Sequence, residues 1–89
     1  MTREELKQLV AETGKNPVVL WREHAGLPRK ELARRADISY ARLMHYETGG
    51  PSGIGREFMR CMVEAGVPAF VLSLYRWWRR REWERSDLN

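Results

Sequence analysis

The chain has 89 residues, a single cysteine and 16 Lys+Arg against 12 Asp+Glu, for a net charge of +4. This length allows one small domain, and one cysteine excludes both an intramolecular disulfide and a zinc site built from several cysteines. A core of this size is often supplemented by oligomerisation, and the basic balance is compatible with an anionic partner without requiring one.

The distribution of charge along the chain is uneven. Residues 17–50 carry a net charge of +2 and residues 76–89 carry the other +2, whereas the remaining segments are neutral. The sequence has no basic-then-apolar leader and no apolar run long enough to cross a bilayer. We therefore expect a cytoplasmic protein with no membrane association.

The first half of the chain is divided into helices by Gly and Pro, and no alternating run of β-branched residues predicts a strand. The sequence TREE at Thr2–Glu5 is a capping box that begins a first helix, and Gly14 ends it. Asn16 and Pro17 then begin a second helix as its N-cap and first residue. This helix is expected to end at Gly26.

The remaining elements follow the same pattern. A third helix is expected over Arg29–Ala36 and a fourth from its N-cap Ser39 to Glu47, followed by a Gly-rich loop over Thr48–Gly55. A fifth helix is expected over Arg56–Ala65, and a last one from Pro68 through Trp83. The residues predicted to face inward on the fifth helix are Phe58, Met59, Met62 and Val63. The expected fold class is all-α, a bundle of about five to six short helices.

The third and fourth helices have the spacing of a helix-turn-helix unit. In such units the first helix crosses the DNA backbone, and the second places its N-terminal residues in the major groove, where base edges display distinct hydrogen-bonding patterns. The outward face of the fourth helix carries small or polar side chains. These candidate base-reading residues are Tyr40, Ala41, Arg42 and His45. Arg42 is the strongest candidate because arginine bidentate to guanine is the commonest specific contact.

A resemblance to a known family runs through the same segment. LWREHAGLPRKELARRADISYARLMHYETG, Leu20–Gly49, resembles the Xre/Cro/C1-type (lambda-repressor-like) helix-turn-helix family of phage repressors and many antitoxin regulators. It is carried by Leu32–Ala33, Ile38–Ser39 and Tyr46–Gly49, and with the following helix it covers about residues 17–67. It implies a DNA-binding fold and divides the chain into an N-terminal helical extension, a DNA-binding domain and a C-terminal helix, residues 1–15, 16–67 and 68–89.

The resemblance also implies roles for individual residues. The phosphate contacts it implies are Arg29, Lys30, Ser39 and, in the glycine-rich loop, Gly50 and Ser52, where backbone amides could also donate. The family usually has glutamine where this chain has Arg29, so a phosphate contact is retained there but the usual bracing between amides is not. Arg22 and Glu47 match a family pair that forms a salt bridge across the core, so Glu47 is expected to be structural.

The end of the chain, RWWRRREWER at Arg76–Arg85, is the most distinctive stretch by composition. In the family the last helix commonly contacts a second subunit, and two half-sites one DNA turn apart require a dimer. We therefore expect a homodimer on a palindromic operator in double-stranded DNA. The residues expected to face a second copy or another partner are Phe70, Leu74, Trp77 and Trp78. Phosphate contacts from Arg79–Arg81 remain an alternative use of the tail.

Catalysis and metal binding are not indicated. His24 and His45 lie far apart with no cysteine or carboxylate at ligand spacing, and no nucleophile motif or phosphate-cradling loop is present. We expect neither an enzyme nor a cofactor. The expected function is a transcriptional regulator, a repressor from a phage, prophage or other mobile element. The alternative is an antitoxin or antiactivator that binds a protein partner through the Trp/Arg-rich C-terminal helix.

Overall fold

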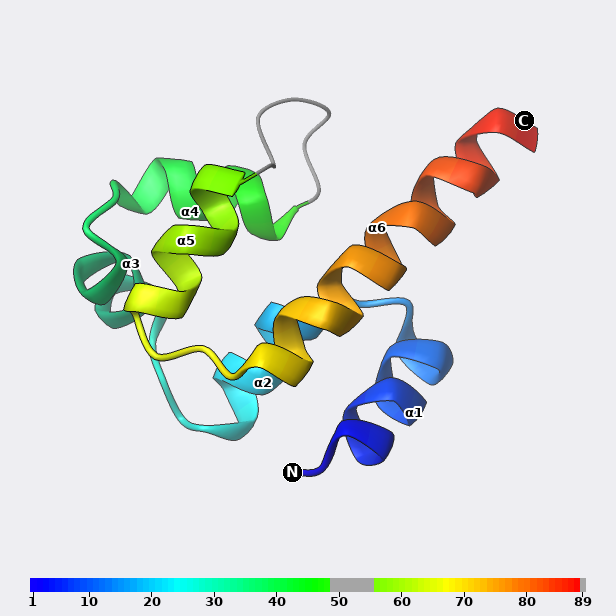
Figure 1. Ribbon diagram of the computed structural model, residues 1–89, viewed down its shortest axis with the longest axis horizontal. Helices are drawn as coiled ribbons and strands as arrows, with labels where there is room; N and C mark the ends of the chain where they lie inside the picture. The colour runs from blue at the N-terminus through cyan, green and yellow to red at the C-terminus, as the bar shows by residue number, and fades with distance from the viewer. Residues whose placement is uncertain (49–55, 89) are drawn as a thin grey trace.

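The computed structural model describes residues 1–48 and 56–88, with side chains of the last helix described up to residue 80. Within these ranges the chain forms six α-helices and no strand, which confirms the predicted all-α class (Figure 1). The helices are α1 Arg3–Thr13, α2 Pro17–His24, α3 Arg29–Ala36, α4 Tyr40–Glu47, α5 Arg56–Glu64 and α6 Ala69–Leu88. The last helix extends further than the predicted Pro68–Trp83, since α6 has 20 residues and ends at Leu88. Arg and Glu dominate its second half, and both have high helix propensity.

The N-terminus of α1 is closed by the predicted capping box. The Thr2 hydroxyl accepts from the amide of Glu5 at 3.1 Å, and the Glu5 carboxylate accepts from the amide of Thr2 at 2.9 Å. Hydrogen bonding of the Glu5 carboxylate to the backbone amide of Thr2, and also to its side chain, lowers the pKa of Glu5 below its ordinary value. Gly14 ends the helix in the left-handed conformation with φ 72°, which a side chain would disfavour.

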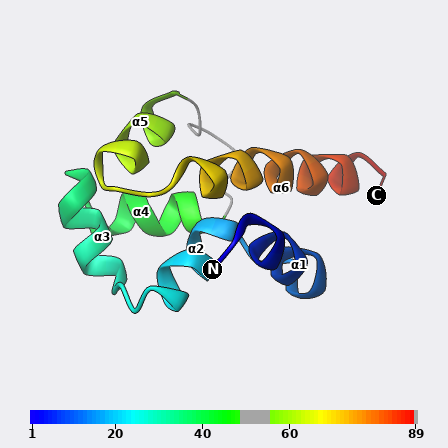
Figure 2. The same ribbon diagram turned by 60° about the horizontal axis from the view of Figure 1, so that its bottom comes forward.

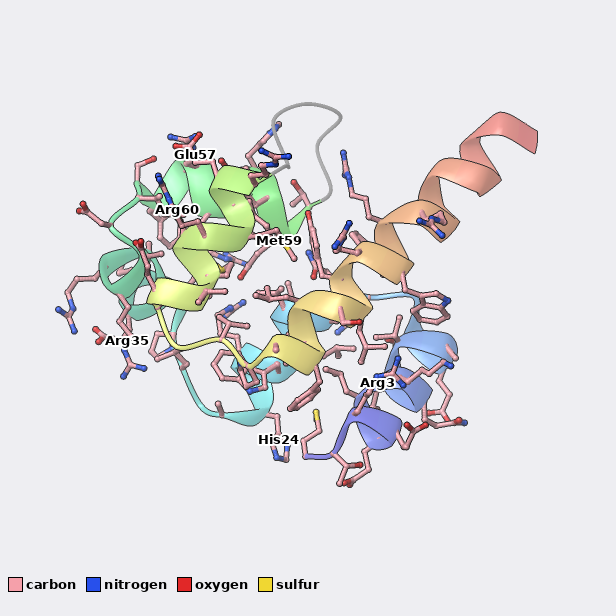
Figure 3. The ribbon with its side chains drawn as sticks, viewed as in Figure 1. Arg3, His24, Arg35, Glu57, Met59 and Arg60 are labelled. Atoms are coloured by element: carbon pink, nitrogen blue, oxygen red, sulfur yellow. The ribbon has the colours of Figure 1, made fainter. Side chains whose placement is uncertain are left out.

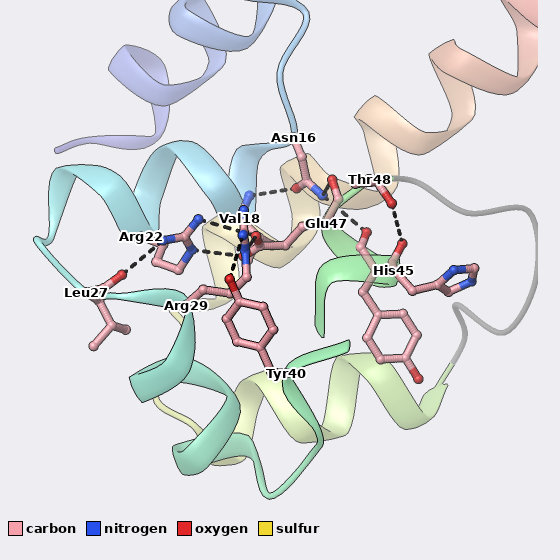
Figure 4. Close-up of polar contacts among 10 residues, drawn as sticks. Asn16, Val18, Arg22, Leu27, Arg29, Tyr40, His45, Glu47 and Thr48 are labelled. Atoms are coloured by element: carbon pink, nitrogen blue, oxygen red, sulfur yellow. Dashed lines mark hydrogen bonds and ion pairs between the residues drawn. The ribbon is translucent and has the colours of Figure 1, made fainter. Parts of the chain in front are cut away.

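Asn16 joins α2 to α4. Its Oδ1 accepts from the amide of Val18 at 2.9 Å, which is the predicted N-cap. Its Nδ2 donates to the carbonyl of Glu47 at 3.1 Å and to that of Tyr46 at 3.5 Å (Figure 4). Carbonyls at a helix C-terminus have no partner within their own helix, so this buried amide satisfies the last turn of α4 from a distant segment.

The helices form two groups that share one hydrophobic core. The first half of α6 packs against α1 and α2, while α3, α4 and α5 lie together at the other end of the molecule (Figures 1 and 2). The three predicted segments, residues 1–15, 16–67 and 68–89, all contribute to this core. Its fully buried side chains include Leu6, Val18, Leu32, Leu43, Phe58 and Tyr75.

Two residues predicted to face a partner belong instead to this core. Leu74 is 1% exposed and Trp78 is 9% exposed, because α1 and α2 cover that side of α6 within the same chain. The indole Nε1 of Trp78 also donates to the carbonyl of Gly14 at 2.9 Å, which fastens α6 to the end of α1. The prediction that these two side chains contact a second molecule is therefore wrong. Phe70 and Trp77 are partly buried.

The inward-facing residues of α5 were predicted correctly with one exception. Phe58 and Met62, one turn apart, are fully buried, and Met59 is partly buried. Val63 was predicted to face inward but is 61% exposed. Successive helical residues are rotated by about 100°, so the position after a buried Met62 turns away from the core.

Candidate nucleic-acid interface

α3 and α4 are two short helices joined by a tight turn. Asp37 ends α3 in the left-handed conformation with φ 56° and ψ 45°, and its amide donates to the carbonyl of Arg34 at 3.2 Å. Ser39 begins α4, since its Oγ accepts from the amide of Arg42 at 3.1 Å. A turn of three residues therefore connects the helices, and α3 lies across α4 (Figure 2). These observations confirm both predicted boundaries.

The predicted base-reading residues all lie on exposed positions of α4. Leu43, Tyr46 and Glu47 are buried, so the helix presents its opposite side to solvent. The exposed positions comprise Tyr40, Ala41, Arg42 and His45. Met44 is also 40% exposed and was not predicted, although its position one turn after Tyr40 places it on the same face. We call these five residues the α4 edge.

Arg42 is exposed but held in place by two neighbours. Its Nε donates to the Tyr46 hydroxyl at 2.9 Å, and its guanidinium lies over the Tyr46 ring at 5.6 Å from the centroid. A terminal nitrogen forms an ion pair with Glu57 of α5 at 2.9 Å. The hydrogen bond to Tyr46 and the charge of Glu57 raise the pKa of Arg42. Arg42 is thus held in position along α4, and the carboxylate of Glu57 would compete with any ligand for its guanidinium.

Glu47 is the centre of a buried ionic cluster. Arg22 donates to both of its carboxylate oxygens, from Nε at 2.9 Å and from a terminal nitrogen at 3.3 Å, and also to the carbonyl of Leu27 at 3.2 Å (Figure 4). The side chains of Arg22 and Glu47 are 9% and 2% exposed. This bidentate contact confirms the expected salt bridge, and it links α2 to the end of α4.

Arg29 extends this cluster to the α4 edge. Its Nε donates to Glu47 at 2.7 Å, and a terminal nitrogen donates to the Tyr40 hydroxyl at 3.2 Å (Figure 4). Its guanidinium also lies 5.7 Å from the centroid of the Tyr40 ring. The hydrogen bonds to Glu47 and Tyr40 raise the pKa of Arg29. Sequence reasoning gave Arg29 a phosphate contact and did not anticipate that it would orient Tyr40.

The remaining basic residues of α3 differ in their partners. Arg34 and Arg35 both form ion pairs with Glu31, and these hydrogen bonds lower the pKa of Glu31 to about 2. Lys30 is exposed and forms no ion pair with another described residue. Of the predicted phosphate contacts on this helix, Lys30 therefore has the least neutralised charge.

The other predicted phosphate contacts fall in two places. Ser39 is exposed, and although its oxygen caps α4, its hydroxyl can still donate to a phosphate. Gly50 and Ser52 lie outside the described residues.

Neither a cluster of metal-ligating side chains nor a membrane-spanning helix occurs in the described ranges. No His, Cys, Asp or Glu residues there gather into a group of three or more that could hold a metal ion. None of the described helices combines the length and the apolar character needed to cross a membrane.

No family model matches this chain, and no curated protein or solved structure is significantly similar to it. The resemblance to the Xre/Cro/C1-type family therefore stays a prediction.

Proposed function

We propose that this protein binds double-stranded DNA with the α4 edge in the major groove and regulates transcription as a homodimer on a palindromic site. The proposal is supported chiefly by one observation: α4 leaves Tyr40, Ala41, Arg42 and His45 exposed on a helix that follows a three-residue turn. An α-helix fits the major groove, and Arg42 supplies the donor pair that matches guanine.

The rigidity of the unit favours this function over that of a generic surface helix. α4 is fixed at its start by the Ser39 cap and at its end by Asn16 and the Arg22–Glu47 pair. A side chain aligned before binding loses less conformational entropy when it contacts a base edge. Ser39 directly precedes the α4 edge, and Lys30 is exposed on α3, so both suit phosphate contacts that would set the register on the duplex.

The dimer is proposed because one helix in one groove rarely provides operator-level affinity, whereas two half-sites do. It also supplements a small core. Leu74 and Trp78 are buried within the chain, so the dimer contact must involve other residues. We propose that the bound dimer represses transcription by occupying its site.

The experiment begins with selection of bound sequences from random duplex DNA by the full chain, followed by affinity measurements over a range of salt concentrations. Arg42→Ala should weaken binding to the selected site by roughly 5- to 150-fold, corresponding to about 1–3 kcal/mol for a bidentate base contact. It should also relax the preference at one base pair. Lys30→Ala should weaken all sequences alike and remove about one phosphate contact from the salt slope.

Arg3→Ala is the matched control. The side chains of Arg3 and Arg42 are 48% and 46% exposed, and each forms an ion pair with a glutamate. The two variants lose the same charge, but Arg3 is on α1, away from the α4 edge (Figure 3). Equal affinities of Arg42→Ala and Arg3→Ala for the selected site would rule out the groove assignment.

A further inference from the structure

A groove lies between α5 and the first part of α6, on a side of α5 that the proposed DNA contact does not use. It has a volume of about 510 Å³ and is lined by Met59, Val63, Leu72, Arg76, Trp77 and Arg80, among others. Figure 3 shows Met59 on the side of α5 that faces α6, whereas Glu57, the partner of Arg42, lies on the other side. We call this the α5–α6 groove.

The floor of the α5–α6 groove is apolar. Val63 is 61% exposed, more than any other large apolar side chain that the structure describes, and Met59 lies one turn before it on the same face of α5. Leu72 of α6 also lines the groove and is buried. A single exposed valine is ordinary, but an exposed apolar surface that lines a hollow is suited to receive apolar side chains from a partner.

The rim of the α5–α6 groove is positively charged. Arg76 and Arg80 are one helical turn apart, both are exposed, and neither forms an ion pair with a described residue. By contrast, every arginine in residues 1–48 is paired with a glutamate. Two like charges at this spacing repel each other, so a ligand that supplies carboxylates would relieve the repulsion.

The geometry points to an acidic amphipathic helix of another protein as the occupant of the α5–α6 groove. Its apolar side chains would lie on Met59 and Val63, and carboxylates one turn apart would pair with Arg76 and Arg80. One turn of the partner helix spans about 5.4 Å, which matches the spacing of the two arginines. A DNA duplex fits less well, because its phosphates would meet the arginines but nothing on its outer surface would fill an apolar hollow.

This occupant is independent of the proposed DNA contact. The groove residues Met59 and Val63 and the Arg42 partner Glu57 lie on different faces of α5, so an acidic helix and DNA could bind the same chain together. The acidic helix is thus a second partner, which the chain would bring to a DNA site or which would control the chain's own binding to DNA.

The test uses the full chain to select from a randomised library of helical peptides, with the enriched peptides scored for charge and apolar pattern. We expect acidic amphipathic sequences. Replacing their Glu residues by Gln should weaken binding by about tenfold or more, as expected for the loss of charge-assisted hydrogen bonds. In NMR titrations the methyl resonances of Met59 and Val63 should shift on binding.

Three variants locate the contact. The double variant Arg76→Ala/Arg80→Ala and the single variant Val63→Glu should each reduce peptide affinity by at least about tenfold. The matched control is Arg56→Ala/Arg60→Ala, which also removes two exposed arginines one turn apart, but from α5. Since all five substituted residues are exposed, circular dichroism should show every variant folded.

Several outcomes would overturn the proposal. These are enrichment of no peptide, enrichment of peptides without acidic character, or equal affinity of the Arg76/Arg80 and Arg56/Arg60 variants. If Val63→Glu converts a dimer to a monomer while no acidic peptide binds, the groove holds a second copy and the proposal is wrong. If the Arg76/Arg80 variant loses only DNA affinity, the rim binds phosphate and the proposal is wrong. The proposal is supported if Val63→Glu loses peptide binding and keeps its DNA affinity. The effect of Arg42→Ala on DNA binding tests the proposed DNA contact separately.

Discussion

The buried carboxylate of Glu47 offers the sharpest test of how the fold is held together. Glu47→Gln keeps the size of the side chain and one carbonyl acceptor but removes the charge that two arginines share. Removing one partner of a buried ion pair costs about 3–5 kcal/mol, because the remaining charge stays buried without compensation. Here that charge is Arg22, whose side chain is 9% exposed. Arg29, at 31%, is open enough for water to replace part of its contact.

This loss is large compared with the total stability of the protein. A domain of this length has an unfolding free energy of roughly 4–13 kcal/mol. For domains of this size each kcal/mol corresponds to about 4–8 °C in Tm, so Glu47→Gln should lower the Tm by about 12–40 °C. Urea and thermal unfolding followed by circular dichroism measure both quantities, and the urea midpoint should fall without a change in slope.

Glu31→Gln provides the matched control. Glu31 also accepts hydrogen bonds from two arginines, Arg34 and Arg35, but these side chains are 72% and 48% exposed. The same chemical change at this exposed cluster should reduce stability much less, because water solvates the groups left behind. If the two Glu→Gln variants have the same urea midpoint, burial does not determine the strength of the Glu47 cluster and the reasoning is refuted. A double replacement, Arg22→Met with Glu47→Leu, should recover most of the lost stability.

Three further predictions follow from single contacts. Burial raises the pKa of Tyr75 to about 12, and its hydroxyl has no hydrogen-bond partner among the described residues. The unfolded chain therefore loses this proton at a lower pH than the folded chain does. The free energy of unfolding should be unaffected by Tyr75 below pH 10 and should fall by up to about 3 kcal/mol as the pH approaches 12. Tyr75→Phe should flatten that alkaline slope in urea titrations and be neutral or stabilising at pH 7; an unchanged slope would assign it to another group. Trp78→Phe should cost about 1 kcal/mol through loss of the hydrogen bond to Gly14, so an unchanged urea midpoint would contradict that role. Glu57→Gln should release Arg42 and so raise DNA affinity about a few-fold, as expected for a gain of roughly one charge contact. Weaker binding in fluorescence anisotropy would instead show that Glu57 holds Arg42 in the position that binds DNA.

The helix boundaries were predictable because their signals are local. The capping box at Thr2–Glu5, the caps Asn16 and Ser39 and the ending at Gly14 each depend on residues within one turn, and the structure confirms all of them. The same holds for the exposure of Arg42 on α4, which follows from the spacing of its buried neighbours.

The contacts between distant segments were not predictable in the same way. Asn16 is 31 residues from the Glu47 carbonyl that it satisfies, and Trp78 is 64 residues from Gly14. Apolar spacing showed that Trp78 lies on a buried stripe, but it could not say whether the same chain or a second molecule covers that stripe. The family resemblance favoured a second molecule, and the packing of α1 and α2 on α6 overturned that assignment.

The pairing of charges bears on how the α4 edge would recognise DNA. The arginines of α3 and α4 are all paired with glutamates, so each would have to exchange its carboxylate partner for a phosphate or a base. Under the proposed function, discrimination between DNA sequences would then depend on the positions in which these side chains are held. Tyr40 is oriented through Arg29 by the same carboxylate that binds Arg22, which couples the α4 edge to the core. Arg42 is governed separately, by Glu57 on α5, so a base or phosphate must displace that carboxylate before the arginine is fully available.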